Sequence, residues 1–227
     1  MMGTINDNLL MVQERINRAC QQASRHPDTV KLLAVSKTKP LKMVRQALAA
    51  GQKDFGENYL QDALDKIPSI QGATWHYIGA IQSNKTRHIA EHFDWVHTVA
   101  SIKVARRLSS QRSESSAPLN ILLQVNVNQE SSKAGILAAD LPNLVKSICG
   151  FERIALRGLM AIPEQSDDAE VQRANFSILA SLQKTIQQQF ALPQFDQLSM
   201  GMSNDLEAAI AEGATWVRIG TLIFGER

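Results

Sequence analysis

Hydrophobic residues along this chain follow two patterns that alternate from its beginning to its end. Short continuous apolar runs, typical of buried strands, are separated by segments in which apolar residues recur every three or four positions, as in amphipathic helices. Such alternation is typical of a parallel sheet whose strands are joined by helical crossovers. The short runs predict strands at 31–36, 54–55, 75–78, 95–99, 120–128, 155–162, 197–200 and 215–220.

The segments between these runs predict helices. Apolar residues recur at helical spacing over 8–25, ahead of the first strand. Gly51 is placed to close the helix that follows that strand, and Asn204 with Glu207 predicts a capping box on the last helix. The helices after the first strand are expected at 40–50, 59–67, 84–92, 102–112, 140–149, 169–190 and 205–211.

This order of elements predicts a single (β/α)8 TIM barrel with an extra N-terminal helix, in one domain over 1–227. A length of 227 residues suits one such barrel, and no repeat or linker divides the chain. The competing fold is an open doubly wound sheet. That fold usually carries a glycine-rich phosphate loop after its first strand, of the form GxGxxG or GxxxxGK[ST], and the sequence has neither.

Charge and composition narrow the classes of function. A formal net charge of +2 is too small to indicate binding to nucleic acid or to an acidic membrane surface. No apolar run approaches the roughly 20 residues that span a bilayer, so we expect a cytoplasmic protein. Cys20 and Cys149 belong to no CxxC pair, which argues against a metal site and favours thiols in a reducing compartment.

In an α/β barrel of this kind, function is carried at the C-terminal ends of the strands. Lys37 directly follows the apolar run LLAVS and shares a strand face with Leu33 and Val35. An amine confined beside apolar neighbours is less stable as an ammonium and becomes a nucleophile suited to an aldehyde. A lysine that reaches water over the rim of the barrel explains the same position equally well.

The ends of the seventh and eighth strands predict an anion site. Arg218 and Gly220 share the face that points into the barrel, where an arginine needs an anionic or acceptor partner. Gly220 and Thr221 offer backbone N–H groups and a hydroxyl. Ser199 and Met200 lead into a glycine, further hydroxyls and a helix start, all of which favour an anion. Barrels of this class commonly bind phosphate there, although ordinary turn and cap chemistry explains each half alone.

Other strand ends carry weaker signals. Asn58 follows the second strand and could reach the same site. His76 lies inside the third strand, where we expect a hydrogen-bonded core histidine rather than a ligand. Met160 ends the sixth strand, and its soft side chain could contact a flat ring, although a buried methionine is usually core.

Several of these stretches together resemble the pyridoxal phosphate homeostasis protein family. The resemblance covers the whole chain in order, and that family is similar to the N-terminal barrel of alanine racemase without its second domain. It rests on AVSKTKP (34–40), FGENY (55–59), WHYIG (75–79), QSNK (82–85), GLMAI (158–162), LSMGMSND (198–205) and VRIGT with LIFG (217–225).

The resemblance implies that pyridoxal 5'-phosphate (PLP) is the cofactor and that Lys37 holds it as an internal aldimine. It implies that Arg218 faces the pyridine nitrogen. The other residues that it implies are Asn58 and Met160 beside the ring, and Ser199, Met200, Gly220 and Thr221 at the phosphate.

The resemblance also implies a role in vitamin B6 homeostasis without strong catalytic activity. An arginine at the ring nitrogen can only donate, so the ring stays unprotonated and is a weaker electron sink. Racemisation also needs a second acid–base group, which alanine racemase takes from its other domain. The alternatives are a PLP-dependent amino-acid racemase of low activity and a colourless barrel that binds only phosphate.

The expected partners are PLP and the apo-enzymes that require it. We expect a monomer, because no long exposed apolar stripe is left once the barrel is assigned. Lys133, in the polar loop after the fifth strand, is a candidate for a secondary transfer site.

Overall fold

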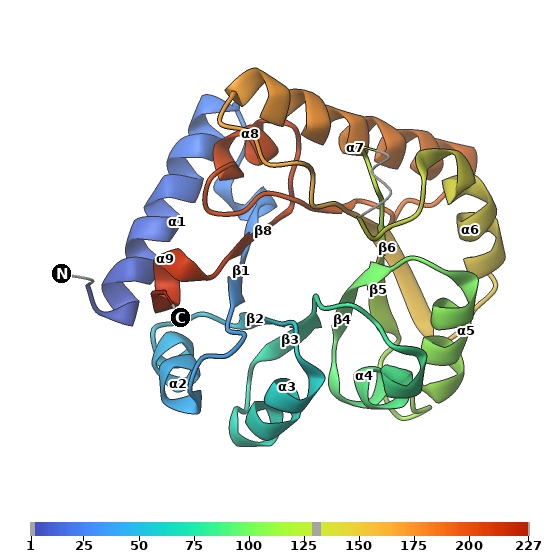
Figure 1. The fold of residues 1–227 in the computed structure, drawn as a ribbon, viewed down its shortest axis with the longest axis horizontal. Coiled ribbons are helices and arrows are strands. Elements are labelled where there is room, and N and C mark those ends of the chain that lie inside the picture. The colour runs from blue at the N-terminus through green and yellow to red at the C-terminus, as the bar shows by residue number, and fades with distance from the viewer. Residues whose placement is uncertain (1–2, 129–132, 227) are drawn as a thin grey trace.

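The computed structural model describes residues 3–128 and 133–226, which form a closed parallel barrel surrounded by helices (Figure 1). Each strand pairs with the next in sequence order, and the last pairs with the first. The strands are β1 (Lys31–Val35), β2 (Asp54–Glu57), β3 (Thr74–Tyr77), β4 (Trp95–Val99), β5 (Leu119–Gln124), β6 (Ile154–Met160), β7 (Gln197–Ser199) and β8 (Trp216–Ile219). The predicted (β/α)8 barrel is confirmed.

The helices connect the strands on the outside of the barrel, and one of them precedes β1 as predicted. They are α1 (Ile5–Gln22), α2 (Leu41–Ala49), α3 (Leu60–Lys66), α4 (Thr86–His92), α5 (Ile102–Gln111), α6 (Leu141–Ile148), α7 (Ala169–Gln189), α8 (Leu206–Ala211) and α9 (Thr221–Phe224). In the described residues, no helix is both long and apolar enough to cross a membrane.

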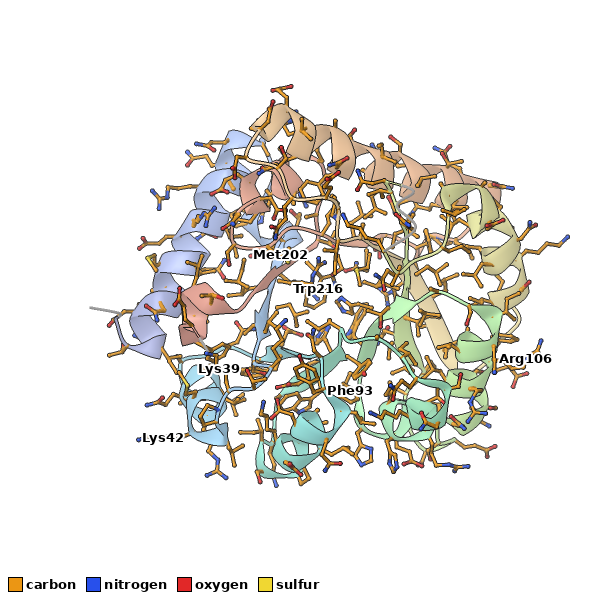
Figure 2. The ribbon with its side chains drawn as sticks, viewed as in Figure 1. Lys39, Lys42, Phe93, Arg106, Met202 and Trp216 are labelled. Atoms are coloured by element: carbon orange, nitrogen blue, oxygen red, sulfur yellow. The ribbon has the colours of Figure 1, made fainter. Side chains whose placement is uncertain are left out.

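The strands bury their two faces against different surroundings. Ala34, Val217 and Ile219 join the hydrophobic cluster between strands and helices. Trp216 is equally buried but lies outside that cluster, at the centre of the ring of strands (Figure 2). Arg218 alternates with Val217 and Ile219, so its side chain enters the barrel, as the sequence predicted.

Several helix starts differ from the predicted ones, and hydrogen bonds explain the differences at α1 and α8. Helix α1 begins at Ile5 rather than at residue 8, because Thr4 and Asp7 form a capping box. The capping box predicted from Asn204 and Glu207 is wrong. The Glu207 carboxylate instead accepts both Nε–H and Nη2–H of Arg15 on α1, so an ion pair between helices takes the place of the local cap.

The short helix α9 was not predicted. It follows β8 after one residue and packs beside α1, near the end of the described chain (Figure 1). Asn8 Nδ2 of α1 donates to the Ile223 carbonyl at 2.9 Å. Lys39 Nζ donates to the carbonyls of Gly225 and Glu226 at 2.7 and 2.8 Å, which ties this end to the loop that carries Lys37.

Candidate functional site

All the predicted site residues lie at or just beyond the C-terminal ends of their strands. Because the strands are parallel, these ends meet at one edge of the barrel, which we call the mouth. Lys37 lies two residues beyond the end of β1, and Asn58 directly follows β2. The remaining predicted residues are Met160 at the end of β6, Ser199 and Met200 at the end of β7, and Arg218, Gly220 and Thr221 in or after β8.

The turn that carries Lys37 is held by a buried ion-pair network. Lys66 Nζ donates to the Ser36 carbonyl, to Glu57 Oε1 and to Asp62 Oδ2, each at 2.9 Å. Ser36 Oγ donates to Glu57 Oε1 at 2.7 Å. On the other side of Lys37, the N–H of Thr38 donates to Asp62 Oδ2 at 2.7 Å. Both neighbours of the candidate nucleophile are therefore fixed.

Glu57 is the most desolvated member of this network. Its side chain has no exposed surface, and within the described residues its Oε2 has no hydrogen-bond partner. Burial raises the pKa of Glu57 from its ordinary 4.5 to about 6, although the bonds from Lys66 and Ser36 act in the opposite direction. The turn under Lys37 thus contains a carboxyl group that titrates near neutral pH.

Lys66 is a member of this network that the sequence did not predict. Asp62 and Lys66 have the i, i+4 spacing of an ordinary surface pair on α3, and only the fold brings Lys66 against Ser36 and Glu57. The lysine is 4 % exposed, which is rare for this residue type without paired carboxylates.

Arg218 lies in the lumen on the floor of the mouth. Its Nη1 donates to Ser199 Oγ at 2.9 Å and its Nη2 to the Ala161 carbonyl at 3.0 Å. Burial lowers the pKa of Arg218 to about 10, so the group remains a cation at neutral pH. Leu33 of β1 is the strand neighbour of Arg218, four residues before Lys37. The cation and the candidate nucleophile therefore come from adjacent strands of one mouth.

Ser199 and Met200 turn their side chains away from the loops of the mouth. The Ser199 hydroxyl lies between Arg218 and His97 Nδ1, 2.9 Å from that nitrogen. The Met200 side chain is buried in the cluster between strands and helices. Any contact of these two residues with a phosphate would come from backbone groups.

A cavity of about 370 Å³ opens between the loops after β6, β7 and β8. Its lining is about half polar, and it combines Ser166, Ser203, Asn204 and Thr221 with the acidic side chains of Asp167 and Asp205. Gly220, next to Thr221, packs closely against β1, since a Cβ there would lie 3.1 Å from the Val35 carbonyl oxygen. Of the residues predicted for the anion site, Thr221 lines this hollow, whereas Ser199, Met200 and Gly220 are not among its lining residues.

Asn58 offers an unused polar atom. Its Oδ1 is buried and, in the part of the chain that the structure describes, has no hydrogen-bond partner. A Cβ at Gly79 would lie 2.0 Å from the Asn58 carbonyl oxygen, so only glycine allows this approach of the two loops. A buried amide oxygen without a partner is costly unless a ligand or water uses it.

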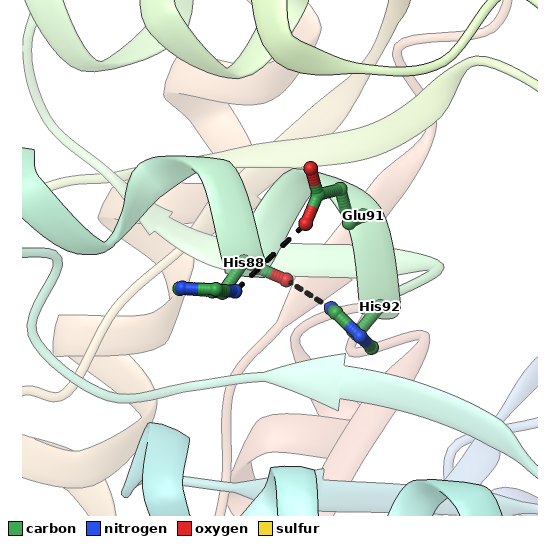
Figure 3. Close-up of side chains that lie close together, drawn as sticks. All are labelled: His88, Glu91 and His92. Carbon is green, nitrogen blue, oxygen red and sulfur yellow. Dashed lines mark hydrogen bonds and ion pairs between the residues drawn. The ribbon is translucent and has the colours of Figure 1, made fainter.

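Two features lie away from the mouth. Figure 3 shows His88, Glu91 and His92 on α4, whose possible ligand atoms all lie within 4.8 Å of one another. His92 Nδ1 already bonds the His88 carbonyl at 2.9 Å, so this nitrogen is not available to bind a metal ion. A cavity of about 550 Å³ beside Arg25 and Pro27 lies beyond the end of α1, remote from every strand end that carries a predicted residue.

Comparison with known proteins shows the family to which the chain belongs. Residues 8–227 match the family described as alanine racemase, N-terminal domain, which defines the class of barrel to which fold and site belong. The pyridoxal phosphate homeostasis protein of Pseudomonas aeruginosa PAO1 is 54% identical over all of this chain and 97% of its own length. That of Escherichia coli K12 is 46% identical over all of this chain and 98% of its own. The chain belongs to the pyridoxal phosphate homeostasis protein family, as the motifs indicated.

Solved structures show the same relationship. PipY of Synechococcus elongatus PCC7942, with PLP bound, is 38% identical with a TM-score of 0.81, covering 92% of this chain and 99% of PipY. Alanine racemase of Clostridium difficile 630 is 13% identical with a TM-score of 0.71, covering 97% of this chain and 57% of that enzyme. The second likeness shows the shared barrel fold alone.

Proposed function

We propose that this protein binds PLP at the barrel mouth, holds it covalently through Lys37, and serves vitamin B6 homeostasis inside the cell. One observation carries the proposal. Lys37 lies in a turn fixed by buried ion pairs, just beyond the end of β1, and β1 pairs with the strand that carries Arg218. The related pyridoxal phosphate homeostasis proteins match the whole chain, and the structure of PipY has been solved with PLP bound.

The residues present fit such a cofactor. Asn58 Oδ1 is a buried acceptor without a partner among the described residues, and Thr221 lines the hollow between the loops after β6, β7 and β8. When bound, PLP supplies an aldehyde that condenses with an amine with loss of one water, and a ring that withdraws electrons. Lys37 would provide the amine, Asn58 and Met160 would hold the ring, and the backbone around Ser199, Met200, Gly220 and Thr221 would hold the phosphate.

Arg218 explains why the proposed role is holding the cofactor rather than turnover. Every nitrogen of a guanidinium carries hydrogen, so Arg218 facing a ring nitrogen can donate to it but cannot accept its proton. The ring then gains no positive charge, and it withdraws electrons from a bound amino acid weakly. This favours storage or delivery of PLP over racemisation.

Trapping the covalent bond tests the site. Borohydride reduction of the PLP-loaded protein, followed by peptide mapping, should place a pyridoxyl group on Lys37, and Lys37→Ala should abolish the label. Lys39→Ala is the matched control, because Lys39 is two residues away and donates to the carbonyls of Gly225 and Glu226. A label on Lys39, Lys85 or Lys133 instead of Lys37 would contradict the assignment.

The proposed role in PLP homeostasis is tested by the transfer of PLP to an apo-enzyme and by the turnover of amino acids. Absorbance of the loaded protein should fall, and activity should appear, when an apo-enzyme that requires PLP is added. Incubation with single L-amino acids should give no more than traces of the D-enantiomer. Rapid D-amino-acid formation that disappears in Lys37→Ala would instead establish the racemase alternative.

Self-association is tested separately. We propose that the protein acts as a monomer, and sedimentation at several protein concentrations should give one concentration-independent species.

A further inference from the structure

A continuous chain of hydrogen bonds runs through the barrel lumen from Asp54 to Arg218. Asp54 begins β2 at the end of the barrel opposite the mouth, and its Oδ1 lies 3.0 Å from His76 Nε2. His76 Nδ1 lies 3.0 Å from His97 Nε2, and His97 Nδ1 lies 2.9 Å from Ser199 Oγ. Ser199 Oγ then accepts from Arg218 Nη1.

The chain of hydrogen bonds is sealed from water over most of its length. His76, His97 and Ser199 are fully buried. Trp95 stacks on His76 with ring centroids 5.6 Å apart, and Trp216 meets the same ring edge-on at 4.8 Å. Only the Asp54 side chain is partly exposed, at 26%. Each polar atom along the chain therefore depends on its neighbours in the chain for its hydrogen bonds.

Burial keeps both imidazoles neutral. It lowers the pKa of His76 against the opposing influence of Asp54 and Asp94, and it lowers the pKa of His97 well below the ordinary value with help from Arg218. Lys31 also faces this region, with its Nζ 4.9 Å from the Trp216 ring, and Arg157 lies over Trp95 at 5.7 Å. The charge of Lys31 further lowers the pKa of His76.

With neutral imidazoles the two ends of the chain dictate one arrangement of protons. An ionised Asp54 only accepts, so His76 carries its proton on Nε2 and has a lone pair on Nδ1. His97 must then donate from Nε2, which leaves its Nδ1 to accept the proton of Ser199. Arg218 only donates, and the remaining lone pairs of Ser199 Oγ receive it. Every donor in the chain points toward Asp54.

We propose that Asp54, His76 and His97 are positioning residues for Arg218. The unidirectional chain commits the Ser199 proton to His97, so the hydroxyl presents a lone pair to the guanidinium. Arg218 is then held between Ser199 Oγ and the Ala161 carbonyl, with its remaining N–H groups available to a ligand on the floor of the mouth. The effect on PLP rests on the proposed function, whereas the proton arrangement belongs to the protein alone.

The proton arrangement is tested first, without cofactor. Nitrogen-15 NMR of the imidazoles in the cofactor-free protein should show two buried histidines that are neutral at about pH 7 and above, each with its proton on Nε2. A charged ring, or a proton on Nδ1 of either histidine, would overturn the proposal. This result does not depend on whether PLP binds.

The coupling to the mouth is tested from the far end. Asp54→Ala changes the barrel at the end opposite any ligand at the mouth, and it removes one of the two ends that set the direction of the hydrogen bonds. The His76 and His97 signals should change to a mixture of tautomers, and PLP should bind about threefold to tenfold more weakly, as loss of one oriented hydrogen bond implies. Thr86→Val is the control, since it removes a buried hydroxyl on α4 outside the lumen.

Two variants of His97 test the middle of the hydrogen-bond chain. His97→Phe fills the same space but leaves Ser199 without its acceptor, and His97→Gln, which can both donate and accept, should recover most of the affinity. The proposal is overturned if Asp54→Ala leaves the tautomers unchanged, or if both His97 variants bind PLP like the Thr86→Val control. Failure of the unmodified protein to bind PLP would instead refute the proposed function.

Discussion

The ammonium of Lys66 donates to the carbonyl of Ser36 at 2.9 Å, directly beside the residue proposed to hold the cofactor. The same ammonium bonds Glu57 and Asp62, and Asp62 accepts from the backbone on the other side of Lys37. One buried cation thus holds the shape of the turn from which Lys37 extends. The contribution of Lys66 to stability can be measured, because removing Lys66 leaves the buried carboxyl group of Glu57 without its cation.

Lys66→Met should destabilise the protein strongly. Removing one member of a buried ion pair typically costs about 3–5 kcal/mol, because the remaining charge is left uncompensated. The free energy of unfolding from urea titration should fall by this order, and covalent capture of PLP should slow. The double variant Lys66→Met with Glu57→Gln removes the stranded charge and should recover part of the loss. Equal stability of the single and double variants would show that Glu57 carries no charge in the folded protein.

Glu57 should give the protein a pH-dependent stability that Glu57→Gln lacks. The pKa of Glu57 is raised on folding from 4.5 to about 6, so the folded state binds this proton more tightly than the unfolded state. The stabilisation is fully present below about pH 4.5 and is lost as the pH rises through about 6, by about 2 kcal/mol.

Urea titrations of both proteins across this range measure the effect. The unmodified protein should lose stability relative to Glu57→Gln as the pH rises. A constant difference between them would mean that the Glu57 pKa is unshifted.

The barrel could be predicted because its pattern is local. Strand and helix periodicity is visible within a few residues, and the alternation of Val217, Arg218 and Ile219 sets which side chain enters the lumen. Lys37 could be named as the candidate that binds the cofactor, because the ends of the strands carry function in this fold.

The polar connections could not be predicted, because they join residues far apart in sequence. His97 and Ser199 are 102 positions apart, and Arg15 reaches Glu207 across 192. The capping box predicted at Glu207 failed for this reason, since a local pattern cannot show that a distant arginine competes for the same carboxylate. His76 was predicted to be a core histidine, and it is, but its neighbours in the lumen had no signal in the sequence.

Thr38 should respond to substitution by glycine. It follows Lys37 with a φ of 61°, a left-handed conformation that is strained for a β-branched residue. Thr38→Gly relieves this strain, which is on the order of 1–2 kcal/mol, but makes the unfolded chain more flexible. We expect a net gain in stability of up to about 1 kcal/mol in urea titration, with slower capture of PLP because the turn is less rigid. Thr38→Ala, which keeps the strained conformation without the branch, is the control and should gain less.

Arg218→Glu should change the character of the bound cofactor. The variant removes the donors to Ser199 and to the Ala161 carbonyl and places an acid where the ring nitrogen is proposed to lie. A carboxylate there can support a proton on that nitrogen, so the ring should withdraw electrons more strongly and trace racemisation or transamination should rise. Affinity for PLP should fall, because a buried cation near a phosphate dianion is lost, and saturation with cofactor separates the two effects.

Arg218→Gln is the matched control, since it removes the charge but keeps a donor, and it should weaken binding without raising activity. If saturated Arg218→Glu has the absorption spectrum and activity of the unmodified protein, Arg218 does not face the ring nitrogen. It would then serve the phosphate or the lumen chain alone, and the weak turnover proposed for this barrel would need another cause.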